Sequence, residues 1–332
     1  MKHLAILVVI LGLAAAACAE PIGEGQPITT RPVGGGDGAT TTAATTTTAA
    51  TTTTTPAATT TTTGAEETTT TEATTTTVVT TPPADTMGVK VYFMLEGGGT
   101  DYRPGPFLVP VYREIPRTQA VATAAMRLLI EGPTDDEQAG VPGLSSAVPA
   151  DTMLLGIDIA DGLATVDLSR EYEAGGGTLS MAARLAQVVF TVTQFPTVQE
   201  VEIHLDGEPV TLFSSEGIIM DHPVGRDDYQ DLTPLIFLDD PAYGAPATCP
   251  LRVRGVAAVF EAQFNWELAN WDGLIVAEGS AMTDNGMGWG NFEFTIPCGV
   301  DQREFASLIV FDYSAQDGTM ENVREHPIWL TP

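Results

Sequence analysis

The sequence predicts an exported protein with two folded domains, the first α+β and the second all-β. Three observations predict this: an apolar N-terminal run that ends at Cys18, a threonine-rich segment after it, and a change of hydrophobic period within residues 88–332. In residues 88–220 helical and strand periods alternate, whereas in residues 233–332 only short strands recur. We expect the boundary between the two domains in the polar stretch 221–233.

The first 18 residues are expected to be a lipoprotein signal peptide. Met1-Lys2-His3 is a short positive start, and the apolar run 4–17 is too short for a stable membrane-spanning helix. Ala15-Ala16-Ala17 lead directly to Cys18, as at sites where a bacterial lipoprotein is cleaved and its cysteine receives acyl chains such as palmitate. The alternative is an ordinary secretory signal, with Cys18 incidental. Both interpretations predict export, and the first predicts a lipid-anchored protein on the extracytoplasmic face of the cell membrane.

Residues 19–87 are expected to form a disordered stalk. Between residues 34 and 86 the chain is almost entirely Thr and Ala, with no apolar period that defines a buried face. Threonine with interspersed proline also suits O-glycosylation, and an unmodified linker is an equal alternative. This segment therefore predicts a tether that holds the folded domains away from the membrane.

The formal net charge of −29 excludes some classes of partner. Seven acidic residues and one arginine belong to the stalk and Lys2 belongs to the signal, so residues 88–332 carry a net charge of −24. Such a surface repels phosphate backbones and anionic lipids, and no basic cluster offsets it. We expect no nucleic-acid partner and membrane contact only through the N-terminal lipid, which leaves basic proteins, cations and neutral glycans.

The first domain is expected to run strand, helix, strand, strand, helix, strand, strand. Alternating apolar residues predict the strands near residues 89–95, 155–159, 164–168, 201–205 and 210–212, and helical spacing predicts the helices at residues 118–131 and 178–194. Asp161-Gly162 and Asp206-Gly207 supply tight turns between successive strands. This order predicts one sheet with two helices on one face.

The second domain has no good helical pattern. Short strands are expected near residues 235–238, 251–262, 265–269, 274–281, 291–296 and 307–313, which predicts a β-sandwich. After Cys18 only Cys249 and Cys298 remain, and a lone pair in an exported domain favours a disulfide. Two buried free thiols remain the alternative, because spacing alone does not bring the sulfurs together.

Several runs resemble a known domain family. In the first domain they are Leu128–Pro133, Gly162–Ser169, Gly175–Gly177, Arg184, Gln187 and Thr193–Val198. Together they resemble the GerMN domain, which is named for bacterial spore germination proteins and occurs in actinobacterial lipoproteins of the LpqB type. Residues 252–262 and 310–318 resemble the immunoglobulin-like domain that accompanies GerMN. The resemblance covers about residues 88–215 and 233–332. It implies a non-enzymatic envelope module, similar to ring-building folds of secretion and sporulation assemblies, and brings no catalytic residues.

No pattern in the sequence points to catalysis or to a cofactor. His204, His222 and His326 stand far apart, and none has a second histidine at the spacing of metal ligands. The chain has no Gly-x-Ser-x-Gly elbow and no Ser-x-x-Lys pair, and Gly175–Gly177 lacks the lysine of a phosphate loop, which favours a flexible turn. Asp135-Asp136-Glu137 is expected to cap a short helix and not to bind calcium. We expect no metal, no cofactor and no enzymatic activity.

Two groups of residues are the candidates for recognition. The first gathers polar residues at the end of a predicted strand and the glycine loop after it: Asp167, Arg170, Glu171, Gly175, Gly176 and Gly177. A surface ion pair with a helix cap is the alternative interpretation of this group. The second is Trp271 and Trp289, which lie beside turns, whereas Trp266 and Trp329 are expected in the core.

These observations favour an interaction or assembly module that binds envelope proteins or copies of itself. The alternative is a lipoprotein whose tryptophan-bearing sandwich binds cell-wall glycan. The least favoured hypothesis is a hydrolase that uses carboxylates around Asp167 as acid and base.

Lipidation of Cys18 gives the first testable prediction. The wild-type protein is expected in the membrane fraction, labelled by a fatty acid fed to the cells, and Cys18→Ala is expected to remove the label and the membrane retention. An unlabelled wild-type protein together with unchanged retention of the variant would contradict the prediction.

Overall fold

The computed structural model describes residues 85–215 and 217–332. The predicted signal peptide and its Cys18 lie outside these residues, as does all of the predicted stalk except residues 85–87. The first strand already begins at Thr86, two residues before the predicted start of the first domain. In the part of the chain that is described, no helix is both long and apolar enough to cross a membrane.

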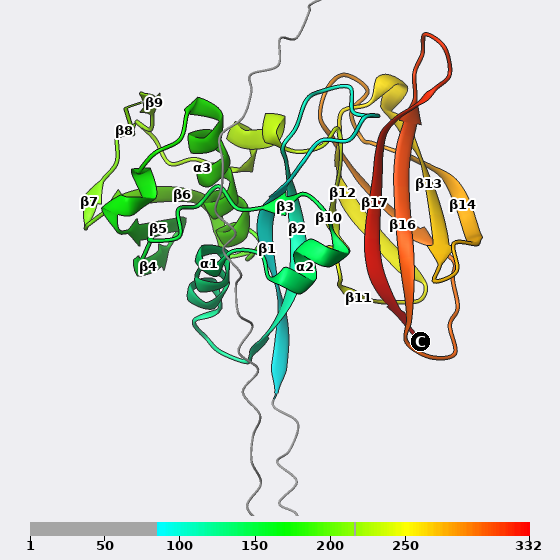
Figure 1. Ribbon diagram of the computed structural model, residues 1–332, viewed down its shortest axis with the longest axis horizontal. Helices are drawn as coiled ribbons and strands as arrows, with labels where there is room; N and C mark the ends of the chain where they lie inside the picture. Colours follow the sequence, from blue (N-terminus) through cyan, green and yellow to red (C-terminus); the bar gives the residue numbers. More distant parts are fainter. Residues whose placement is uncertain (1–84, 216) are drawn as a thin grey trace, which may run out of the picture. The chain divides into compact units, whose positions relative to one another are not determined.

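The first domain contains two main sheets, as Figure 1 shows. One has the order β2-β1-β3 and consists of β1 (Thr86–Leu95), β2 (Phe107–Pro116) and β3 (Leu144–Ser145). The other has the order β4-β5-β6-β7 and consists of β4 (Leu154–Ala160), β5 (Gly162–Leu168), β6 (Val198–Leu205) and β7 (Glu208–Pro209). The predicted single sheet is therefore wrong. The class is as predicted, and β2 is added as the antiparallel partner of β1 along its whole length. In place of the predicted strand at residues 210–212 the chain has two short strands, Glu208–Pro209 and Leu212–Phe213.

Two helices form the centre of this domain. Helices α1 (Val121–Glu131) and α3 (Thr178–Val192) pack against each other and against β1. Strands β5 and β6 run parallel, and α3 is the crossover between them. Because α3 contacts elements of both sheets, nearly all of its side chains from Met181 to Val192 are buried, including Arg184 and Gln187. Its polar residues must therefore find partners inside the protein.

Short elements complete the first domain and lead to the second. They are α2 (Asp135–Gly140), the 3-10 helix η1 (Arg170–Glu173), β8 (Leu212–Phe213), β9 (Ile218–Ile219) and the 3-10 helix η2 (Arg226–Leu232). Helix α2 confirms the predicted cap. The Thr134 hydroxyl accepts from the Glu137 amide, and the Glu137 carboxylate accepts from the Thr134 amide.

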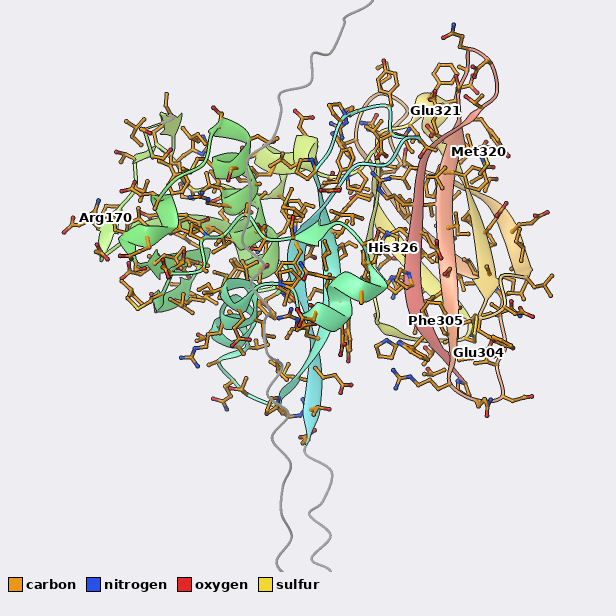
Figure 2. All side chains as sticks on the ribbon, in the orientation of Figure 1. Arg170, Glu304, Phe305, Met320, Glu321 and His326 are labelled. Atoms are coloured by element: carbon orange, nitrogen blue, oxygen red, sulfur yellow. A yellow bond between two sulfur atoms is a disulfide. The ribbon has the colours of Figure 1, made fainter. Side chains whose placement is uncertain are left out.

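The second domain is a β-sandwich. Its smaller sheet has the order β10-β12-β15, with β10 (Ile236–Asp240), β12 (Leu251–Ala257) and β15 (Gly290–Ile296). Its larger sheet has the order β11-β17-β16-β13-β14, with β11 (Pro246–Thr248), β13 (Gln263–Asn270), β14 (Ile275–Met282), β16 (Glu304–Tyr313) and β17 (Met320–Thr331). Strands β16 and β17 are antiparallel, so Glu304 and Met320 begin them at opposite ends of the sheet (Figure 2). The turn at Phe260–Ala262 is a 3-10 helix, η3, and not part of a strand as predicted.

The facing sheets of the sandwich enclose an apolar core that contains Val253, Phe264, Leu268 and Ile296. Trp266 of β13 is also buried, as predicted, and its indole lies over the backbone of the neighbouring strand. A Cβ at Gly279 of β14 would lie only 2.5 Å from the Trp266 ring. Position 279 therefore has to be glycine for the ring to cover β14.

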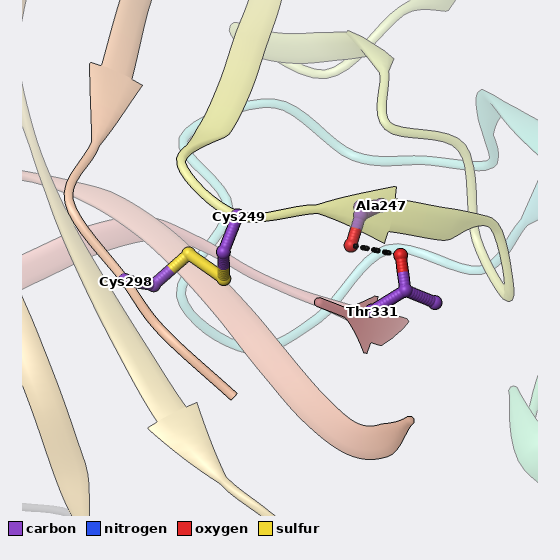
Figure 3. The surroundings of a disulfide bond; sticks show 4 residues. All are labelled: Ala247, Cys249, Cys298 and Thr331. Carbon is purple, nitrogen blue, oxygen red and sulfur yellow. Dashed lines mark hydrogen bonds between the residues drawn. A yellow bond between two sulfur atoms is a disulfide. The ribbon is translucent and has the colours of Figure 1, made fainter. Parts of the chain in front are cut away.

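Cys249 and Cys298 are bonded to each other in the structure, with their Cα atoms 5.3 Å apart (Figure 3). Cys249 follows β11, which pairs in parallel with the end of β17, and the Thr331 hydroxyl donates to the Ala247 carbonyl beside the disulfide (Figure 3). The bond links the connection after β11 to the segment after β15 across 49 residues of sequence. In the chain-entropy account such a loop contributes about 4 kcal/mol of stability.

The disulfide is testable by peptide mapping. Digestion without reductant should give one species that joins the peptides of Cys249 and Cys298, and Cys298→Ser should lower the free energy of unfolding by about 2–5 kcal/mol in denaturant titrations. Recovery of both cysteines as alkylatable thiols from an oxidised native preparation would contradict it.

Candidate functional site

The two domains share one apolar core at their junction. Phe190 of α3 contacts Tyr92 of β1, with ring centroids 5.5 Å apart, and Phe237 of β10, with centroids 5.8 Å apart. All three rings are almost completely buried. The second domain therefore begins inside the core of the first, and the junction is a packed interface.

A charged cluster lies beside this aromatic contact. Asp239 of β10 accepts from the Tyr92 hydroxyl and pairs with Lys90 of β1, whose Nζ lies 2.6 Å from Oδ2 of Asp239. Arg226 of η2 donates from Nη1 to Oδ1 of Asp239 at 3.2 Å. One carboxylate thus joins the first strand of the first domain, the linker and the first strand of the second domain.

Arg226 donates hydrogen bonds from all three nitrogens of its guanidinium group. Its Nε donates to the Thr193 hydroxyl at 2.9 Å, and its Nη2 donates to the Tyr92 hydroxyl at 3.0 Å and to the Phe190 carbonyl at 3.3 Å. Its guanidinium also lies 4.7 Å from the centroid of the Phe190 ring. A planar fork of donors matches these diverging acceptors, which a lysine ammonium could not do.

The electrostatics of the cluster favour its charged form. Burial alone would raise the pKa of Asp239, but Arg226 and Lys90 outweigh that effect and hold the pKa well below its usual range. Burial likewise works to lower the pKa of Lys90, and Tyr92 and Asp239 outweigh it and raise the pKa. The carboxylate and both cations are therefore ionised at neutral pH, and the cluster carries a net charge of +1.

A groove of about 790 Å³ opens over the cluster between the two domains. Lys90, Arg226 and Asp239 line it, apolar contacts come from Phe190 and Phe237, and further charged residues come from the second domain: Arg254, Asp284 and Glu293. The groove thus has charges of both signs and aromatic walls. Such a lining is able to bind a polar partner.

A second seam joins the domains on the other side of β2. Tyr243 forms a parallel bridge with Val111, in which Tyr112 donates to the Tyr243 carbonyl and Tyr243 donates to the Pro110 carbonyl, each at 2.9 Å. The ring of Tyr243 stacks on His326 of β17, with centroids 4.1 Å apart. Figure 2 marks His326 on β17. Burial, with a smaller contribution from Arg324, lowers the pKa of His326 to about 3, so the imidazole is neutral at physiological pH.

The same seam contains a buried ion pair. Arg324 lies 2.6 Å from Asp101, with 6% and 4% of the two side chains exposed. Asp101 belongs to the loop between β1 and β2, and the adjacent Thr100 carbonyl accepts from the Asn322 amide at 2.8 Å. Breaking such a pair by removing one partner leaves a buried charge without compensation. Charged groups therefore hold the junction from both sides.

The predicted patch around Asp167 occupies a different part of the first domain. Asp167 is the last residue but one of β5 and accepts from the Gly207 amide at 2.9 Å, while Arg170 pairs with Asp206 and with Glu173 at 3.3 Å each. Glu171 is exposed, and a hydrogen bond from Ser169 lowers its pKa. Figure 2 shows the Arg170 side chain extending into solvent. These residues mainly fix the turn between β6 and β7, and their role in recognition remains a proposal.

The glycine loop at Gly175, Gly176 and Gly177 is built around Arg184. The Arg184 guanidinium donates to the carbonyls of Tyr172, Ala174 and Gly175 at 2.7–2.9 Å. Gly176 has φ +90°, and a Cβ there would lie 2.8 Å from Arg184 and Ser180. The glycines form the turn before the helix that starts at Thr178, as predicted. The loop closes over a buried cation, and a bulky residue at position 176 would disturb the fold.

The four tryptophans differ in exposure. Trp271, in the turn between β13 and β14, is 70% exposed, in line with its place as a surface candidate. Trp289 is half-buried, and the Arg103 guanidinium lies 5.8 Å from its ring centroid. Trp329 was expected in the core but lies on the outer face of β17, 36% exposed and packed edge-on against Phe305.

Within residues 85–215 and 217–332, no group of three or more His, Cys, Asp or Glu side chains is placed to hold a metal ion.

The junction cluster is the feature that the sequence did not reveal. Its partners lie far apart along the chain, since Lys90 and Asp239 are separated by 149 residues. One signal was present in the sequence. Lys90 interrupts the otherwise apolar stretch Val89–Leu95, and Asp239 directly follows the apolar stretch Ile236–Leu238. A charge inside a buried strand requires a partner, although the sequence alone does not say which one.

The cluster predicts a specific loss of stability. Asp239→Asn leaves Lys90 and Arg226 without their carboxylate and is expected to lower the free energy of unfolding by about 2–4 kcal/mol at pH 7. Asp240→Asn, the matched control, breaks only the half-exposed pair with Arg254 and is expected to cost less than about 1 kcal/mol.

The difference between wild type and Asp239→Asn should also depend on pH. Because folding lowers the pKa of Asp239, its contribution is present above the unfolded pKa of about 4 and is lost as the pH falls below that value. Urea titrations between pH 7 and pH 3 would measure this. A penalty no larger than that of Asp240→Asn, or one that grows on acidification, would contradict it.

Comparison with known proteins supplies the identity of both domains. Residues 90–211 match the sequence profile of Germane, described as sporulation and spore germination. Residues 235–319 match the profile of Gmad2, described as the immunoglobulin-like domain of bacterial spore germination. Neither is a known enzyme family.

Lipoprotein LpqB of Thermobifida fusca (strain YX) is 30% identical over 109 residues, which are 33% of this chain. The match spans only 17% of the length of LpqB.

Solved structures of GerMN domains are also similar to this chain. The first GerMN domain of the sporulation protein GerM from Bacillus subtilis has 20% identity and a TM-score of 0.35, covering 43% of this chain and 99% of that domain. The tandem GerMN domains of the same protein have 18% identity and a TM-score of 0.37, covering 65% of this chain and 63% of that one. From the two profile matches, this chain carries a GerMN domain followed by the immunoglobulin-like domain of bacterial spore germination proteins.

Proposed function

We propose that the chain is a non-enzymatic interaction module of the cell envelope, in which the GerMN and immunoglobulin-like domains act as one binding body. The observation that carries the proposal is the junction: a carboxylate shared by two cations, a common aromatic core and a second buried ion pair fix one domain against the other. A rigid pair of domains presents one continuous surface and loses little conformational entropy when it binds.

The location belongs to the proposal. A lipid on Cys18 would hold the chain at the extracytoplasmic face of the membrane, and the match to a protein named lipoprotein LpqB supports this. The partner is an envelope protein or a second copy of the chain. The glycan-binding alternative now depends mainly on Trp271, because Arg103 already lies against the ring of Trp289.

In-cell photocrosslinking tests the proposal. A photoreactive residue replaces Leu179 of the first domain or Met287 of the second, both more than half exposed, and Trp271 is kept. Discrete protein adducts in the membrane fraction are expected from at least one position. Asp239→Asn should reduce their yield by loosening the junction, whereas Asp240→Asn, with the same change of charge, should not.

Other outcomes would overturn the proposal. Adducts with cell-wall fragments alone would favour the glycan-binding alternative, and no adduct from either position would contradict an interaction role. A purified chain that hydrolyses peptidoglycan, at a rate abolished by Asp167→Asn, would make it an enzyme.

A further inference from the structure

Strand β14 forms an open edge of the larger sheet. It pairs with β13 alone, and no other strand in residues 85–215 or 217–332 pairs with its outer side. Val276 is an extra residue that forms a bulge, after which the register from Ala277 to Met282 is regular. The outward N–H and C=O groups of these residues are a template on which a further strand can form.

The opposite edge of the same sheet is protected. Strand β11 has only three residues, one of them Pro246, and the chain after it is tied by the disulfide at Cys249. Short length and proline are devices by which proteins block strand addition. The regular part of β14, Ala277–Met282, contains neither proline nor lysine, so this edge has no such block.

Exposed apolar side chains lie at both ends of β14. Trp271 and Leu274 precede the strand, with 70% and 63% of their surfaces exposed, and Met282 ends it at 64%. Between them Ala277, Gly279 and Ala281 are small, so another backbone can approach closely. The edge therefore offers backbone pairing in the middle and apolar contacts at the ends.

The outer face of the sheet next to this edge is acidic. Glu278 of β14 lies directly opposite Glu267 of β13, and the same row continues through Ile309 of β16 to Glu325 of β17. Like charges in directly opposite positions, with Cβ atoms about 5 Å apart, destabilise a sheet. None of the ion pairs formed within the described residues includes Glu267 or Glu278.

We propose that β14 accepts an extended segment of a basic partner protein as an additional strand, with lysine or arginine side chains on the face of Glu278 and Glu267. This inference rests on the proposed interaction function and names its surface and the chemistry of its partner. A strand added about 4.8 Å from β14 would place every second side chain on that outer face. A cation there relieves the repulsion between the two glutamates.

A second copy of the chain is a poorer occupant of the edge. Each set of residues 88–332 carries −24, so two copies repel each other. Pairing of β14 with itself would also add a second Glu278 to the row of carboxylates. Charge complementarity therefore favours a partner with basic residues at alternate positions.

A designed peptide tests the inference on the purified full chain. The probe is acetyl-Lys-Val-Lys-Val-Lys-Val-Lys-amide. Its matched control has proline in place of the central valine, which keeps the charge and prevents strand pairing. The first peptide should bind and slow hydrogen exchange at the amides of residues 277–282, and the control should do neither.

Protein variants test the charge. Glu278→Gln should weaken binding of the first peptide about two- to fivefold, the range expected for one exposed ion pair. Glu304→Gln removes the same charge at the start of β16 (Figure 2) and should leave the affinity unchanged. The thermal melt of Glu304→Gln should match the wild type, and that of Glu278→Gln should be equal or slightly higher, since it removes the repulsion with Glu267 and keeps the shape of the side chain.

Four results would overturn the inference: equal binding of the proline peptide, unchanged affinity of Glu278→Gln, protection at another strand, or protection of β14 that rises with protein concentration without peptide. The last would make a second copy the occupant. Each leaves the interaction function standing if photocrosslinking still gives partner adducts, so failure of this surface and failure of the proposed function are distinguishable.

Discussion

The charge on Asp239 is the constraint on which the arrangement of this protein depends. A carboxylate that is three-quarters buried needs compensation, and it receives it from two cations and a tyrosine hydroxyl. Its partners lie on β1 and η2, whereas Asp239 itself lies on β10, the first strand of the β-sandwich. The path of the linker and the placement of the second domain are therefore set by one local requirement, the neutralisation of a buried charge. Asp239, Lys90 and Arg226 also line the groove beside the junction.

Helix α3 imposes the same kind of requirement within the first domain. Arg184 satisfies the carbonyls of the loop before the helix, and the amide of Gln187 links the Ala147 amide to the Tyr92 carbonyl. Gln194, just after the helix, exchanges two hydrogen bonds with the backbone of Lys90. Arg184, Gln187 and Gln194 are among the residues that carry the resemblance to GerMN domains. In this structure they hold the fold together, so the motif identifies the architecture and leaves the binding surface to other residues.

Much of the fold could be predicted from the sequence because the apolar period is strong where an element buries one face. Both long helices and the β4–β5 hairpin follow directly from that period. Strands β2 and β17 were missed because Pro110 and Pro327 interrupt them and charged or polar residues lie on both faces of β17. The division into two sheets could not be predicted, since periodicity specifies faces and not which strands pair. The junction cluster depends on contacts between residues far apart in sequence, and the role of Gly176 depends on the position of Arg184.

The position of Lys90 has a mechanical consequence. Strand β1 begins at Thr86, so any tension that reaches the folded domains from the preceding chain enters through this strand. Four residues further along, Lys90 forms an ion pair with Asp239 of the second domain. Strand β1 is also the central strand of its sheet and is hydrogen-bonded along its length to β2. A pulling force is thereby shared between both domains at the point where it arrives, before it can separate them. The junction therefore resists separation of the two domains, and a body anchored at one end would be pulled as a single object.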